Sequence, residues 1–196
     1  LGMGYGISRL HGALCSGSID GIDVNGSAYF QKVCVQAPSP PWFWGMLHLD
    51  DGSYIDWFLP HVSPTLTAKD SRHWKRRDIA HYPLSMGGLF HDVSRQRSER
   101  FSEVRVERTC NEYGLPTFHV HMWNGLTEIR IEAKSVTRAH WTFDQPTRGG
   151  MKSHLTYNEY PLDVTKLEID DELGVRTRKD WEVIRGNAEH SWGLLH

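Results

Sequence analysis

The chain has 196 residues, and its 22 Lys and Arg against 24 Asp and Glu give a net charge of -2. This balance gives no electrostatic reason to expect binding to nucleic acid or to an anionic membrane. Hydrophobic residues make up 39% of the sequence, as in globular domains, and no apolar run is long enough to span a bilayer as a helix. Three cysteines without CxxC spacing exclude a disulfide framework and favour a reducing, cytoplasmic setting.

Tryptophan and histidine are the unusual components, with 8 Trp and 12 His. Trp is a large amphipathic side chain that is common in pockets, and His is common in functional sites, so the composition favours ligand binding. The chain starts at Leu1 without a Met or a signal sequence, and it opens on a glycine-rich stretch. We therefore expect a fragment of a longer protein.

Strand and turn signals recur along the chain while helical signals are scarce, which predicts an antiparallel all-β fold with little helix. Besides two clear hairpins, six further strands are predicted, at 12–19, 27–36, 101–108, 155–164, 176–183 and 186–194. The proline-rich run Pro38–Pro41 predicts a short spacer between two parts of the chain. Residues 63–95 are rich in turn formers and predict long loops, in which Lys75–Arg77 would be a solvated basic surface.

The first hairpin is predicted from two aromatic runs that flank Asp51-Gly52. A two-residue loop there would pair Leu47 with Asp56 and His48 with Ile55. One face would then hold Trp44, Met46, His48, Ile55 and Trp57, and the other Phe43, Leu47, Leu49, Tyr54, Asp56 and Phe58. Both faces are apolar, so we expect both to be covered by other parts of the protein.

Asp56 is the exception on its predicted face. A carboxylate among apolar side chains costs several kcal/mol unless it is paired or protonated. One interpretation is a strand-end Asp that reaches solvent or backbone donors. The other is a pocket acid beside Tyr54 with a raised pKa, which requires burial without a Lys or Arg partner.

The second hairpin is predicted at Asn124-Gly125, between 118–123 and 126–132. A two-residue loop would place Val120 opposite Ile129 and His121 opposite Glu128. The core face would be Phe118, Val120, Met122, Ile129 and Ile131. The His119-Val-His121 pattern could place two imidazoles on one metal, but its spacing to Glu128 fits a surface pair better. We predict no metal and no cofactor.

Residues 17–62 resemble a known family. The motifs that carry the resemblance follow in order: Gly17–Gly21, Val24–Tyr29, Trp42–Gly45, Leu49–Gly52 and Tyr54. They resemble the pattern of hydroxyneurosporene synthase (carotenoid 1,2-hydratase) and AttH-like proteins. In these, a Val-x-Gly-x-aromatic strand, a break, a Trp-x-Trp strand and a Leu-Asp-Asp-Gly turn succeed one another. Weaker similarity to later family strands occurs at Tyr157–Tyr160 and Gly186–Glu189.

The resemblance implies two tandem lipocalin-like (calycin) barrels. Residues 1–37 would be the last strands of a truncated first barrel, and residues 42–196 would form a second barrel. The chain would then contact the missing part of the first barrel. The implied function is binding of an apolar, isoprenoid-like small molecule in an aromatic-lined pocket or between barrels. The alternative is a lyase or isomerase of the hydratase or pericyclase kind. The His and Trp that follow the conserved aromatic in the hydratases are not kept, because Phe30–Cys34 occupies that stretch.

The predicted catalytic residues are Asp56, as the proton donor, and Tyr54, which would orient it and which resembles the family's Tyr-x-Asp pair. Phe43 and Phe58 are predicted as walls of the same pocket. The resemblance adds three ligand-binding candidates, Tyr29, Glu159 and Glu189. Trp44 and Trp57 are expected on the opposite face of the hairpin, packed against a neighbouring layer.

Overall fold

The computed structural model describes residues 4–36, 40–63, 81–146 and 152–194. Their strands are β1 (Gly4–Ile19), β2 (Ile22–Gln36), β3 (Trp42–Leu49), β4 (Tyr54–Val62), β5 (Tyr82–Pro83), β6 (Gly87–Asp92), β7 (Arg97–Phe101), β8 (Glu103–Cys110), β9 (Pro116–Trp123), β10 (Glu128–Ser135), β11 (Ala139–Pro146), β12 (Lys152–Asp171), β13 (Gly174–Thr177) and β14 (Ile184–Leu194). The one helical element among the described residues is a 3-10 turn, η2 (Arg178–Asp180). The all-β prediction is therefore confirmed.

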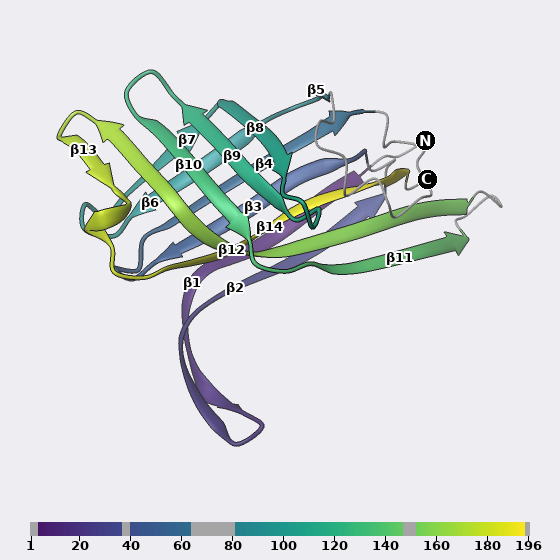
Figure 1. Ribbon diagram of the computed structural model, residues 1–196, viewed down its shortest axis with the longest axis horizontal. Coiled ribbons are helices and arrows are strands. Elements are labelled where there is room, and N and C mark those ends of the chain that lie inside the picture. Colours follow the sequence, from purple (N-terminus) through teal and green to yellow (C-terminus); the bar gives the residue numbers. More distant parts are fainter. Residues whose placement is uncertain (1–3, 37–39, 64–80, 147–151, 195–196) are drawn as a thin grey trace.

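The main sheet is antiparallel and curls back on itself (Figure 1). Within the described residues it has 12 strands, in the order β7-β6-β4-β3-β14-β12-β10-β9-β8. Outside this path, β5 pairs with β4, and β11 and β13 pair with β12. β8, at one end of this path, contacts β4 and β6 near the other end. The strands therefore form a half-barrel with an inner and an outer face. No helix in the described residues is long and apolar enough to cross a membrane.

A long hairpin of β1 and β2 forms a separate two-stranded sheet. Its turn has positive φ at both Asp20 and Gly21, as a two-residue type I′ loop requires. A register shift between Leu10 and Ala13 marks a bulge, where Gly12 has a φ of 60°. One part of the hairpin crosses the main sheet near β3 and β14, and its tip projects beyond the sheet (Figure 1).

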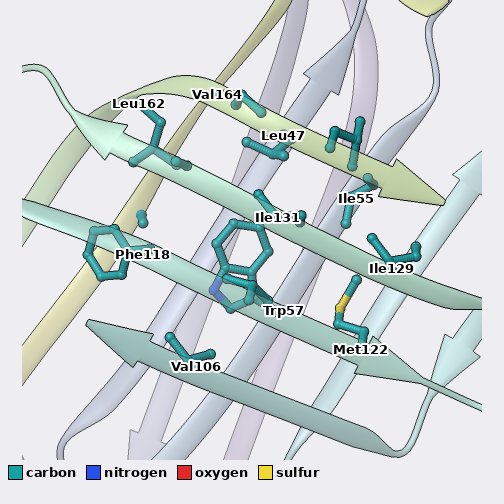
Figure 2. Packing of buried hydrophobic residues seen from close by; sticks show 14 of the residues in the cluster. Leu47, Ile55, Trp57, Val106, Phe118, Met122, Ile129, Ile131, Leu162 and Val164 are labelled. Carbon is teal, nitrogen blue, oxygen red and sulfur yellow. The ribbon is translucent and has the colours of Figure 1, made fainter. Parts of the chain in front are cut away.

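The inner face of the half-barrel is a packed apolar core. Figure 2 shows Trp57 among side chains from several strands, including Val106, Phe118 and Ile131. Trp57 is 0% exposed, and Gly45 on the paired strand provides its space, because a Cβ there would lie 2.1 Å from the Trp57 ring. Further large side chains that are fully buried are Trp192, Tyr160, Phe43 and Phe90. Packed side chains therefore fill the interior of the half-barrel.

The predicted register of the first hairpin is wrong by one residue. Leu47 pairs with Ile55 and His48 with Tyr54, because the loop has three residues, Asp50 to Gly52. The N–H of Gly52 donates to the Leu49 carbonyl at 3.0 Å, and Gly52 has a φ of 86°, as in a type I turn followed by a left-handed residue.

This slip exchanges the predicted faces, because side chains alternate along a strand. Tyr54, Asp56 and Phe58 share the outer face with Trp44 and Met46, which were expected on the opposite side. Phe43, Leu47, Leu49, Ile55 and Trp57 belong to the inner core.

The predicted register of the second hairpin is wrong by two residues. Because side chains alternate along a strand, a shift of two leaves each side chain on its predicted face. Val120 pairs with Ile131 and Met122 with Ile129, since the loop runs over four residues, from Asn124 to Thr127. The Asn124 side-chain oxygen accepts the backbone N–H groups of Leu126 at 3.0 Å and Thr127 at 2.8 Å, which holds the longer loop. All five residues predicted for the core face are at most 3% exposed.

Two further stretches differ from the prediction. The segment expected to be long loops contains β6, whose Phe90 is fully buried. Of the strand expected at 176–183, only the first two residues are in a strand, β13, and the η2 turn follows them. Lys75–Arg77 and the first two residues of the Pro38–Pro41 spacer lie outside the described residues.

Candidate functional site

Polar and aromatic side chains gather where the β1–β2 hairpin covers the outer face of β3, β4, β12 and β14. We call this region the hairpin–sheet interface; it comprises Arg9, His11, Tyr29, Trp42, Trp44, Tyr54, Asp56, Tyr157, Glu159 and Glu189. The hairpin contributes the first three, and strand alternation places the others on one face. It contains two carboxyl groups that are nearly fully buried, those of Asp56 and Glu189.

Asp56 lies under the hairpin and is 4% exposed. Its Oδ2 lies 3.0 Å from His11 Nε2 and 3.5 Å from an Arg9 guanidinium nitrogen. Burial raises the pKa of Asp56, and the hydrogen bond with His11 and the charge of Arg9 oppose that rise. Asp56 is therefore buried as the pocket-acid interpretation requires, but it has an Arg partner, which that interpretation excluded.

Tyr54 lies on the same outer face as Asp56, beside the hairpin. Its ring stacks on His11 at 4.6 Å between centroids, with an interplanar angle of 5°, and on His91 at 5.2 Å. Burial raises the pKa of Tyr54, and the nearby Asp56 carboxylate adds to the rise. The structure thus brings the two predicted catalytic residues together, with His11 in contact with both.

Tyr29 connects the two ends of the interface. Its ring centroid lies 5.3 Å from that of His11 and 5.3 Å from that of Trp44. Its hydroxyl donates a hydrogen bond to Gln31 Oε1 on the same strand. Trp44 is 5% exposed, and its indole N–H has no hydrogen-bond partner among the described residues. Trp44 is the cross-strand partner of Glu189 on β14, whereas Asp56 on β4 is the partner of Met46, two residues further along β3.

Glu189 on β14 is 6% exposed and is held by neutral donors. The Trp42 indole N–H donates to its Oε2 at 2.7 Å, and the Tyr157 hydroxyl donates to its Oε1. Burial raises the pKa of Glu189 to about 7, although both hydrogen bonds favour the charged form. Burial also raises the pKa of Tyr157, with a further contribution from Glu189.

Glu159 on β12 is the cross-strand partner of Glu189. It is half-buried and accepts a hydrogen bond from the Asn187 side chain at 2.7 Å. Its charge adds to the raised pKa of Glu189. Two of the candidates taken from the family resemblance are therefore adjacent.

The predicted walls of the pocket lie on opposite faces. Phe58 is half-buried on the outer face. Phe43 belongs to the core, where its ring contacts those of His61, at 4.9 Å, and His190, at 4.3 Å. The structure therefore does not bring Phe43 together with Asp56.

Four residues of the interface were not predicted as site residues: Arg9, His11, Trp42 and Tyr157. Arg9 and His11 are more than 40 positions from Asp56, with separations of 47 and 45 residues. Trp44 could have been found, because a three-residue loop at Asp50–Gly52 places it beside Asp56.

The imidazoles of His119 and His121 lie on the partly exposed outer side of β9, away from this interface. His121 Nε2 lies 2.5 Å from Glu128 Oε1, which also contacts Arg130 at 2.6 Å. His119 faces Glu132 at 3.9 Å. In the described part of the chain, no group of three His, Cys, Asp or Glu side chains is arranged to hold a metal ion.

The fold and the interface define an all-β protein with a half-barrel sheet and a covered acidic and aromatic outer face. No protein-family model matches the chain, and no curated protein matches it. A solved structure of a candidate AttH protein from Nitrosomonas europaea is similar, with 15% sequence identity and a TM-score of 0.49. The match covers 95% of this chain and 52% of that one, so this chain spans about half the length of its structural neighbour.

Proposed function

We propose that the protein is a lipocalin-like domain that binds an apolar, isoprenoid-like small molecule at the hairpin–sheet interface. The observation that carries the proposal is the gathering of aromatic rings and buried carboxyl groups between two separate sheets. Ligand sites combine aromatic and apolar surfaces with placed polar groups, and this interface brings the rings of Trp42, Trp44 and Tyr157 beside buried carboxyl groups.

The packed interior of the half-barrel supports a ligand site at the hairpin–sheet interface instead of inside the barrel. Trp57, Tyr160 and Trp192 are each 0% exposed in the core, so an interior ligand would have to displace large packed side chains. The interface is covered by a hairpin whose strands, among the described residues, pair only with each other. Separation of the hairpin from the main sheet would therefore break side-chain contacts, such as those of Arg9 and His11 with Asp56, but no strand ladder.

The domain assignment is part of the proposal. We assign residues 1–37 to a preceding lipocalin-like barrel and residues 42–196 to a second one. The hairpin exposes large apolar side chains, including Leu10 at 54%, Leu14 at 94% and Phe30 at 63%. Further strands of a preceding barrel would cover these side chains, and the ligand would then lie between two barrels.

A second candidate function is a lyase or isomerase that uses Asp56 as its proton donor. The raised pKa of this buried carboxyl favours it. In a hydration, the Asp56 proton would pass to one carbon of a double bond and water would add to the other. The proton released by that water would return to Asp56.

Binding can be tested by tryptophan fluorescence with farnesol, an isoprenoid alcohol, as the probe. Tyr29→Ala removes a ring from the interface, and Tyr113→Ala, at a position that is 74% exposed, is the matched control. We expect Tyr29→Ala to weaken binding by roughly threefold to tenfold, in line with the energy of one aromatic contact, and the control to leave it unchanged. Equal affinities in the two variants would contradict the proposed location.

A further inference from the structure

The surroundings of Glu189 contain aromatic rings as well as hydrogen-bond donors. The rings of Trp42 and Tyr157 lie 6.2 Å apart at an angle of 57°, and both residues donate to the Glu189 carboxyl. Trp44 is directly opposite Glu189 on β3, and Tyr29 packs against Trp44. One carboxyl group thus lies within a set of four aromatic residues.

No cationic side chain contacts Glu189 among the residues that the structure describes. Its two hydrogen bonds come from an indole and a phenol, and its cross-strand partner, Glu159, is a second acid. A buried carboxylate without a cation is costly, so this arrangement favours any ligand that brings a positive charge.

We propose that Glu189 and its aromatic neighbours bind an alkylammonium group, which would be the cationic end of an otherwise apolar ligand. This inference rests on the proposed function and specifies the class of its ligand. Ammonium groups are attracted to the faces of Trp and Tyr rings, and quaternary ammonium groups are bound in proteins by aromatic cages. A nearby carboxylate adds a direct charge interaction in a region that water reaches poorly.

The charge state of Glu189 gives the inference a pH signature. Its pKa of about 7 means that the carboxyl is mostly neutral at pH 6 and mostly ionised at pH 8. Only the ionised form neutralises the ligand. Affinity for a permanently charged ammonium should therefore rise about tenfold from pH 6 to pH 8, whereas affinity for a neutral alcohol should not change.

The test is calorimetric titration of the full chain with hexyltrimethylammonium and, separately, with hexanol. We expect the cation to bind more tightly than the alcohol at pH 8 and to show the tenfold pH dependence. Glu189→Gln should remove both the preference and the pH dependence while leaving hexanol binding intact. Glu182→Gln, at an exposed position, is the control and should behave as the wild type.

A second variant keeps the test valid if Glu189→Gln folds poorly. Trp42→Leu removes one ring and one donor, and it should weaken binding of the cation more than binding of hexanol. Equal binding of the two probes by the wild type, with hexanol binding still sensitive to Tyr29→Ala, would overturn the ammonium site and leave the proposed function standing. Absence of Tyr29-dependent binding of either probe would overturn both.

Discussion

Asp56 and Glu189 lie on the same outer face of the sheet, on the strands that flank β3, and both are almost fully buried. They differ in their partners. Asp56 has an imidazole and a guanidinium from the hairpin, whereas Glu189 has two neutral donors from the sheet. The difference shows that burial alone does not define a functional acid: Asp56 has protein groups to balance its charge, and Glu189 must be protonated or balanced by a ligand.

The largest expected effect is that of Asp56→Asn on catalysis. The substitution keeps the shape of the side chain and removes the titratable proton, so any turnover that uses Asp56 as its acid should fall by at least 100-fold. Binding of an apolar ligand should stay roughly the same. Steady-state kinetics on an isoprenoid alkene, with fluorescence titration as the control, would check this. Unchanged turnover would assign proton transfer elsewhere.

The next largest effect is the pH dependence that Glu189 gives to the free energy of unfolding. Its folded pKa of about 7 is higher than the value of 4.5 for an unperturbed Glu, so the folded state binds more protons than the unfolded state between these pH values. Wild-type stability should therefore fall, relative to Glu189→Gln, by roughly 3 kcal/mol as the pH rises from 4.5 to above 7.

Urea unfolding of both proteins across this pH range gives the measurement. The same comparison for Asp56→Asn should show a smaller change of the same sign, because Arg9 and His11 limit the rise of that pKa. A larger change at Asp56 than at Glu189 would reverse the comparison between the two carboxyl groups.

A smaller effect of opposite sign is expected from the core. Burial and the proximity of His81 lower the pKa of His61 to about 3, so below pH 6.5 the unfolded state binds the proton and the folded state does not. Stability should fall by roughly 2 kcal/mol between pH 6.5 and pH 5 on account of His61. His61→Phe should remove this fall in acid unfolding experiments, which isolates the titration of the outer-face carboxyl groups. An unchanged acid profile would show that the His61 ring is not buried as a neutral group.

The sequence supported the all-β fold because turn chemistry at Asp51-Gly52 and Asn124-Gly125 is local. The lengths of the two loops decided the strand register and, with it, which side chains share a face. A slip of two residues at Asn124 kept Val120 and Met122 in the core, whereas a slip of one at Asp51 exchanged the faces of Asp56 and Trp57.

The partners of the site could not be predicted in the same way. Arg9 and His11 reach Asp56 only because a separate hairpin crosses the sheet, and no local pattern in either segment encodes that contact. Glu189 was a candidate through family resemblance, but its two donors come from β3 and β12, far away along the chain. Long-range packing therefore decided which acid has a cationic partner.

The most direct test is a pH titration of the Glu189 carboxyl carbon by 13C NMR, assigned by comparison with Glu189→Gln. We expect a midpoint near 7, because the Glu189 carboxyl is buried with neutral donors and without the cationic partners that Asp56 has, and a lower midpoint when hexyltrimethylammonium is added. A midpoint at or below 4.5, unmoved by the cation, would contradict it.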